Sequence, residues 1–140
     1  MAVLLKRIYD APAASDGKRV LVDRLWPRGV SKGSARLECW LRDLAPSDSL
    51  RKWFGHRPER FSVFRRRYLK ELSSPAASRA LERLYSLVRA SSVVTLVFAA
   101  KDTERNNAVV IKELLEGMRK PPASSGALRA VSARARAPRR

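Results

Sequence analysis

"VVTLVFAA", which runs from Val93 to Ala100, decides the fold class because it is almost wholly apolar. A strand of an antiparallel sheet usually alternates between apolar and polar residues, since one of its faces meets water. A short apolar run without that alternation is typical of a strand that is covered on both faces, as in parallel sheets. We therefore predict a buried strand of a mainly parallel sheet at 93–100.

Two further stretches, both nearer the start of the chain, are predicted as strands. "VLLKRIY" at Val3–Tyr9 alternates weakly, and "RVLVDRLW" at Arg19–Trp26 is rich in branched apolar residues. Between them, Pro12 and the pair Asp16-Gly17 indicate a loop.

Helical spacing of apolar residues marks the middle and the end of the chain. Four helices are predicted: Ser47–Gly55, Pro58–Leu72, Ala76–Ala90 and one over residues 107–118. The segment around Cys39, "LECWLRDLA", also has a helical pattern, in which a small buried thiol is favoured over a nucleophile. Strands and helices in this arrangement predict an α/β fold, a small mainly parallel sheet flanked by helices.

The chain has 140 residues, of which 45% are hydrophobic, and this predicts one compact domain at residues 1–120. The tail from Pro121 to Arg140 contains five arginines and no acid, and accounts for five of the net +17 charges. Because it has no sustained apolar period, we predict that it is disordered. The alternative is a basic arm that scans nucleic acid.

Composition also limits the chemistry. The longest uncharged apolar run is far shorter than the roughly 18 residues that span a bilayer, and no secretion signal leads the chain, so a soluble cytoplasmic protein without membrane contact is predicted. A single cysteine and a single histidine exclude an intramolecular disulfide and a multi-cysteine zinc site, and we predict no metal. The phosphate-loop, dinucleotide and nucleophile-elbow motifs are missing from the sequence, so no cofactor is predicted.

Polar side chains follow each predicted strand. Since the carboxyl ends of parallel strands meet at one edge of a sheet, where open α/β folds bind ligands, these side chains are expected to gather around one hollow. The residues concerned are Arg7, Tyr9, Asp23, Arg24, Trp26, Arg28, Lys101, Asp102 and Asn106.

Each of these residue types suits a ligand site but also has a structural interpretation. Arg24 and Arg28 could hold a phosphate or carboxylate through paired donors, and the helix after Asp102 adds backbone amides. Trp26 offers a flat face for a base or is a core plug under the loop. Asp23 is a general base, a magnesium ligand or the salt-bridge partner of Arg24.

Three further residues are weighed as proton carriers. Lys101 and Asp102 are, with Asp23, the candidates for catalysis, although Lys101 could equally pair with a neighbouring acid. His56 normally titrates near neutrality, but a histidine that simply completes its turn is the favoured interpretation.

The segments "KRIYD", "DGKRVLVDRLWPRGVSK", "CWLRDLAPSDSLRKWFGH", "FRRRYLKEL" and "VFAAKDTERNNAVVIKELL" together resemble the YeaO-like family of small bacterial proteins, a domain of unknown function. The resemblance covers nearly all of Lys6 to Leu115 and implies an α/β fold, with no established activity. Relatives often carry an acidic residue where Arg57 stands and a histidine where Asn107 stands. The resemblance therefore implies that any proton transfer at the second position is lost here.

Three hypotheses about function follow, and whether the chain is an enzyme stays open among them. The leading hypothesis is that the carboxyl edge binds an anionic, phosphate-bearing and nucleotide-like small molecule, with or without turnover. The second is a nucleic-acid-binding accessory protein that uses the basic surface and tail. Its helical arginines would be Arg65, Arg66, Arg67, Arg79, Arg83 and Arg89. The third is a protein-interaction module with Trp53 and Phe54 as anchors.

Overall fold

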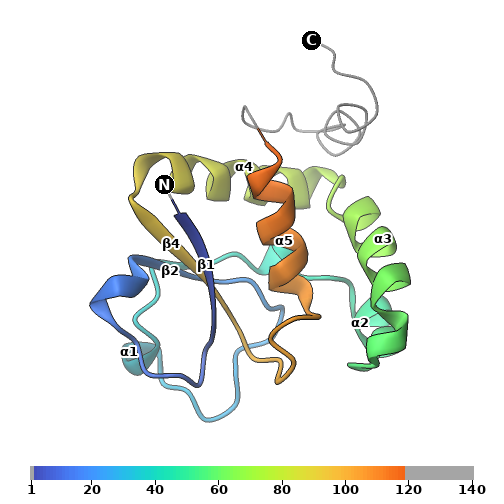
Figure 1. The fold of residues 1–140 in the computed structure, drawn as a ribbon, viewed down its shortest axis with the longest axis horizontal. Coiled ribbons are helices and arrows are strands. Elements are labelled where there is room, and N and C mark those ends of the chain that lie inside the picture. Colours follow the sequence, from blue (N-terminus) through green and yellow to red (C-terminus); the bar gives the residue numbers. More distant parts are fainter. Residues whose placement is uncertain (1, 119–140) are drawn as a thin grey trace.

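The computed structural model describes residues 2–118, so the predicted disordered tail lies outside the described residues. The α/β prediction is confirmed, because four parallel strands form one sheet in the order β1-β4-β2-β3 (Figure 1). The strands are β1 (Ala2–Arg7), β2 (Lys18–Leu21), β3 (Cys39–Trp40) and β4 (Val93–Phe98). The helices are α1 (Lys32–Ala35), α2 (Asp48–Phe54), α3 (Phe61–Glu71), α4 (Pro75–Ala90) and α5 (Asn107–Glu116).

The predicted buried strand β4 lies inside the sheet. It pairs along its whole length with β1, from Ala2↔Val93 to Arg7↔Phe98, and on its other side with β2, from Lys18↔Val94 to Leu21↔Val97. Both edges of β4 are therefore paired. The strand is apolar along its length because it is buried, and it lacks the alternation of apolar and polar residues that a half-exposed strand shows.

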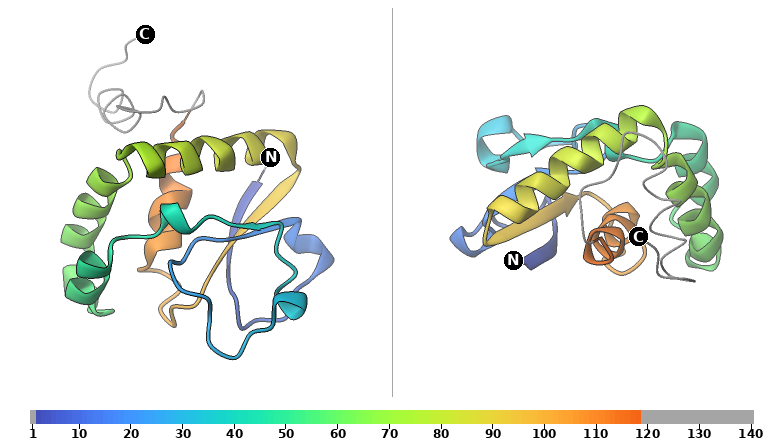
Figure 2. Two further views of the ribbon diagram at one scale, coloured as in Figure 1. Left: turned by 180° about the vertical axis from the view of Figure 1, so that it is seen from behind. Right: turned by 90° about the horizontal axis from the view of Figure 1, so that it is seen from above.

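The two faces of the sheet are covered differently. Val94, Leu96 and Phe98 of β4 belong to the larger core, into which α3, α4 and α5 also pack. Val97 points to the other face and joins a smaller cluster with Leu21 and the α1 residue Ala35. In Figure 1, α4 runs across the top of the molecule, and α3 and α5 lie below it. Figure 2 shows the same arrangement from behind and from above. Long helices thus cover one face, and loops with α1 cover the other.

Two sequence predictions need correction. The second strand ends at Leu21 instead of Trp26, so the charged and aromatic residues that follow belong to a loop. The segment around Cys39 is not a helix: it forms β3 and then a 3₁₀ turn at Arg42–Leu44. The physical reason is pairing with the free edge of β2, where the Glu38 N–H donates to the Arg19 carbonyl (2.7 Å) and the Leu41 N–H to the Leu21 carbonyl (2.9 Å).

The predicted helix boundaries mostly hold because capping residues set them. Ser47, Ser74 and Asn106 accept backbone N–H groups at the starts of α2, α4 and α5. Gly55 ends α2 in the left-handed region, with φ of 54°. None of the helices in residues 2–118 has the length and apolar character needed to cross a membrane.

Gly17 holds the start of β2 against β4, and its replacement tests this contact. Its φ is +64°, and a Cβ built on it would lie 2.2 Å from the Val93 carbonyl oxygen. We expect Gly17→Ala to lower the free energy of unfolding by about 3 kcal/mol, through backbone strain and overpacking. Urea unfolding followed by tryptophan fluorescence measures the change.

Gly33→Ala is the matched control for this prediction. Gly33 lies in α1 outside the left-handed region, and nothing is within 4 Å of a Cβ added there. Its replacement should be neutral or stabilise by about 0.5–1 kcal/mol. Equal effects of the two substitutions would contradict the explanation.

Candidate functional site

The C-terminal end of β1 and the loop after β2 both contact the residues that follow β4. The Arg7 guanidinium donates from Nε to the Ala100 carbonyl (3.0 Å) and from Nη2 to the Ala99 carbonyl (3.2 Å). From the opposite side, the Asp23 carboxylate accepts the Ala99 N–H (2.9 Å). Strand order explains the meeting, because β4 lies between β1 and β2. Arg7 and Asp23 are thus brought together at one edge of the sheet, which we call the carboxyl edge.

Asp23 is half-buried and is held by neutral donors. Besides Ala99, its second oxygen accepts a hydrogen bond from the Asn107 side-chain amide of α5 (3.0 Å), which also donates to the Val22 carbonyl. Burial raises the pKa of Asp23 above its ordinary value, although the hydrogen bonds from Asn107 and Ala99 and the charge of His56 act in the opposite direction. Within residues 2–118 no Lys or Arg forms an ion pair with Asp23, so the salt bridge with Arg24 is absent there.

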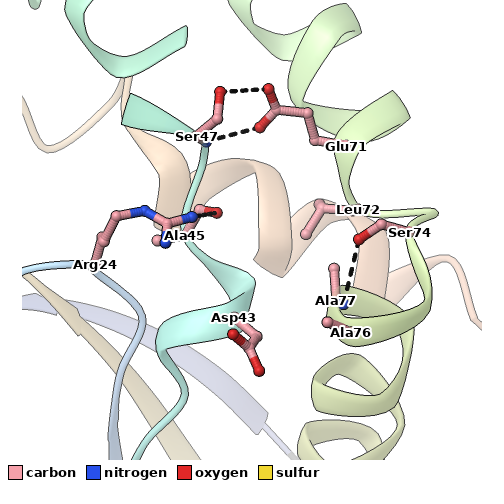
Figure 3. A pocket seen from close by; sticks show the side chains of 9 residues that line it. All are labelled: Arg24, Asp43, Ala45, Ser47, Glu71, Leu72, Ser74, Ala76 and Ala77. Atoms are coloured by element: carbon pink, nitrogen blue, oxygen red, sulfur yellow. Dashed lines mark hydrogen bonds between the residues drawn. The ribbon is translucent and has the colours of Figure 1, made fainter. Parts of the chain in front are cut away.

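Arg24 points toward the backbone before α2. It donates to the Pro46 carbonyl (3.3 Å) and the Ala45 carbonyl (3.5 Å). Its side chain lines an open hollow of about 360 Å³, shown in Figure 3. The hollow is lined by Arg24, Asp43, Ala45, Ser47, Glu71, Leu72, Ser74, Ala76 and Ala77.

The charge of this hollow is mixed. Glu71 and Asp43 accompany Arg24, and Glu71 already accepts the backbone N–H (2.8 Å) and the hydroxyl (2.6 Å) of Ser47. These bonds are the dashed lines between Ser47 and Glu71 in Figure 3. Two carboxylates beside one guanidinium do not favour an anion in this hollow, which Arg28 does not line. An anion held jointly by Arg24 and Arg28 stays a prediction.

Trp26 closes its own loop. Its indole N–H donates to the Val30 carbonyl (2.6 Å), and its ring meets Trp40 edge to face with centroids 5.3 Å apart. Trp40 in turn donates to the Asp23 carbonyl oxygen (2.7 Å). Of the two interpretations of Trp26, this geometry matches a plug under the loop, because the half-buried ring packs against the smaller core cluster.

Asp102 and Asn106 organise the turn into α5. One Asp102 oxygen accepts the N–H groups of Glu104 (2.9 Å) and Arg105 (3.1 Å), and these bonds help to hold the pKa of Asp102 below its ordinary value. Asn106 is buried, caps α5 at Val109 and donates to the Asp102 carbonyl. Both side chains are engaged in local structure, away from the Asp23 contacts.

Tyr9, Arg28 and Lys101 reach the surface at the carboxyl edge. The Tyr9 hydroxyl donates to the Arg28 carbonyl (3.0 Å), which joins the loop after β1 to the loop after β2. The Arg7 guanidinium lies 5.2 Å from the centre of the Tyr9 ring. Arg28 and Lys101 are exposed, and neither side chain forms an ion pair in the described part of the chain.

His56 lies in the turn after α2, with its backbone in the left-handed region at φ of 57°, directly after Gly55. Its ring centroid is 6.2 Å from that of Phe54, and its side chain is exposed. The charge of His56 lowers the pKa of Asp23 and so opposes the effect of burial. A non-glycine residue in this conformation is uncommon and strained.

Sequence reasoning did not find the role of Asn107. In the sequence, Asn107 shares the helical period of the apolar residues Ile111 and Leu114, and in the structure its amide reaches across to the end of β2. A polar residue among the apolar positions of a helix was the feature of the sequence that could have indicated this role. Residues 2–118 contain no group of three or more His, Cys, Asp and Glu side chains that could hold a metal ion. Burial raises the pKa of Cys39, which does not favour a nucleophilic thiolate.

Comparison with known proteins gives relatives but no activity. A family model, DUF488-N3i, described as "Inactive DUF488-N3 subclade", matches residues 2–129. An uncharacterised protein of Mycobacterium tuberculosis (strain H37Rv) is 44% identical over 115 residues, which are 82% of this chain and 94% of the relative. The uncharacterised protein YeaO of Escherichia coli (strain K12) is 37% identical over 118 residues, 84% of this chain and all of the relative. No solved structure matches.

The raised pKa of Asp23 predicts a pH-dependent effect of Asp23→Asn. The folded chain holds the Asp23 proton more tightly than the unfolded chain, so ionisation of this group lowers the free energy of unfolding. We expect the wild type to lose stability relative to the variant as the pH rises above 3.8, the ordinary pKa. Urea unfolding between about pH 3 and about pH 7 measures the trend.

Asp102→Asn is the control with the opposite sign. Backbone hydrogen bonds lower the pKa of Asp102, so the wild type should lose stability relative to this variant as the pH falls below 3.8. A wild type that gains stability over Asp23→Asn as the pH rises would show that the pKa of Asp23 is lowered in the folded chain.

Proposed function

The chain belongs to the DUF488-N3i family, and from that premise we propose that its domain binds an anionic, phosphate-bearing small molecule of nucleotide type at the carboxyl edge of the sheet. The observation that carries the proposal is the arrangement of Tyr9, Arg28 and Lys101. Arg28 and Lys101 form no ion pair within residues 2–118, and Tyr9 exposes its aromatic ring; all three lie in loops that follow parallel strands.

Positive charge is available at this edge and is held on linked loops. The loop of Arg28 is joined to Tyr9, and the segment before Lys101 is joined to Arg7 through the Ala100 carbonyl. Arg7 uses two N–H groups on carbonyls and, as a guanidinium with five donors, keeps others. Cations on neighbouring loops suit a phosphate group, since charge-assisted hydrogen bonds are among the strongest that proteins form.

The edge also exposes apolar surface, which a purely inorganic anion would not use. The exposed large hydrophobic residues of the described chain are Leu4, Tyr9 and Leu25. Tyr9, 47% exposed, and Leu25, 62% exposed, lie in the loops after β1 and β2. The hydrogen bond from the Tyr9 hydroxyl fixes its ring, so stacking a planar base on it costs little side-chain entropy. A ligand with both a phosphate and a planar group fits this combination.

Binding without turnover is the form of the proposal that the family description favours, since its model is that of an inactive subclade. The two acidic candidates for proton transfer agree with it. Asp23 is engaged by Ala99 and Asn107, and Asp102 by the turn into α5. Lys101 is then a cation for binding in the proposal, and its role as a proton donor stays a prediction.

Of the anchors in the protein-interaction alternative, Phe54 is buried in the core, and Trp53 is half-buried. Because these two side chains are not exposed as anchors for a partner protein, we prefer binding of a small ligand to the protein-interaction alternative.

Arg28→Ala tests the anion contact. With adenosine 5′-monophosphate as the probe, we expect binding by the wild type and an affinity at least about tenfold lower for the variant, the loss that one charge-assisted hydrogen bond predicts. Isothermal titration calorimetry gives the affinity, and the rise in melting temperature with ligand concentration gives an independent measure.

Arg79→Ala is the matched control, because Arg79 is an exposed α4 arginine that forms no ion pair within residues 2–118. It removes the same charge elsewhere and should leave the affinity unchanged. Tyr9→Leu should weaken the nucleotide but not inorganic phosphate. The proposal fails if the nucleotide does not bind, or if Arg79→Ala and Arg28→Ala weaken it equally.

A further inference from the structure

We propose that the phosphate backbone of a nucleic acid binds to a second surface, the basic stripe of α3, formed by Arg60, Arg67 and Lys70. This surface is separate from the carboxyl edge and does not depend on the small-ligand proposal. The proposal assigns the general attraction of a basic chain for polyanions to three particular side chains, two on α3 and one immediately before it.

Helix geometry places these three cations on one side of α3. Arg60 immediately precedes the helix, and Arg67 follows it by seven positions, which is close to two turns of 3.6 residues. Lys70 lies three positions after Arg67 and is therefore its neighbour on the helix surface. Phe64 and Tyr68, from the buried side of α3, lie in the core. In Figure 1, α3 forms the right-hand side of the molecule and α2 lies beside its lower end.

Trp53 of α2 positions the guanidinium groups of the basic stripe. The Arg60 and Arg67 guanidinium carbons lie 5.0 Å and 4.7 Å from the centre of the Trp53 ring, and Arg60 also donates to the Trp53 carbonyl. Stacking leaves the N–H groups at the rim of each guanidinium available to an anion. Because the side chains are already ordered, binding costs less rotamer entropy than binding by free surface arginines.

The charge of the basic stripe is not neutralised within the described chain. No acid forms an ion pair with Arg60, Arg67 or Lys70 among residues 2–118. Two nearby arginines differ, since Arg57 pairs with Glu59 and Arg65 with Glu113. Like charges at helical spacing repel, so a polyanion that neutralises several of them at once gains the energy of that repulsion.

A nucleic acid suits this surface better than a membrane does. Membrane-surface helices combine cations with exposed apolar side chains that enter the headgroup region. The exposed large hydrophobic residues of the described chain, Leu4, Tyr9 and Leu25, all lie outside α2 and α3. The basic stripe therefore offers charge without an apolar anchor, which matches a row of phosphates.

The double variant Arg67→Gln/Lys70→Gln tests the proposal in the full chain. Both side chains are exposed, so the fold should survive, and urea unfolding verifies this. The probe is a fluorescein-labelled single-stranded oligonucleotide of about 20 nucleotides, longer than a typical single-strand site. Fluorescence anisotropy over a series of salt concentrations gives the slope of log affinity against log salt. Losing two phosphate contacts should reduce that slope by about 1.4.

Arg79→Gln/Arg83→Gln is the matched control, because it removes two exposed arginines from α4. It should leave the slope within about 0.3 of the wild-type value, well below the effect of one contact. The proposal is overturned if the two double variants lower the slope equally, if the wild-type chain does not bind the oligonucleotide, or if the α3 variant reduces binding only to anionic lipid vesicles.

Discussion

The pairing of β4 with β1 on one side and β2 on the other is the constraint on which the rest of the structure depends. It explains the almost wholly apolar sequence of β4, because a strand inside a parallel sheet meets water on neither edge nor face. It also determines where the polar chemistry lies. With all strands parallel, the exits of β1, β2 and β4 share one edge, and Arg7 and Asp23 contact the residues after β4 from opposite sides.

The local sequence was sufficient to predict those helices and strands that have capping residues or a strong apolar pattern of their own. The run at 93–100, the caps at Ser47 and Gly55 and the apolar stripe of α3 all predicted the observed elements, since each signal lies within one segment. β3 could not be found in this way. Two residues carry no period, and Cys39 and Trp40 are a strand only because β2 offers them an unpaired edge. Tertiary pairing here overrode a helical pattern.

The same distinction applies to the candidate site. That charged residues follow each strand could be read from the sequence, and the topology brings Arg7, Tyr9, Asp23 and Arg28 to one edge. How each side chain uses its donors could not be read, because that depends on partners far away in the chain. Arg24 donates to carbonyls before α2, and Asn107 crosses from α5 to Asp23. Helical spacing places such an amide on the inward side of its helix but does not identify the distant carboxylate and carbonyl to which it donates.

Asp23 forms no ion pair in the described part of the chain, and such a group says more about where a functional site lies than the net charge does. The chain has 30 Lys and Arg residues, so a cation could readily have neutralised a half-buried carboxyl. The described structure instead surrounds Asp23 with an amide side chain, a backbone N–H and the charge of His56, and burial raises its pKa. Such an arrangement lowers stability when Asp23 is ionised. Local costs of this kind in natural proteins concentrate at functional sites, and this one lies beside the surface that exposes Tyr9 and Arg28.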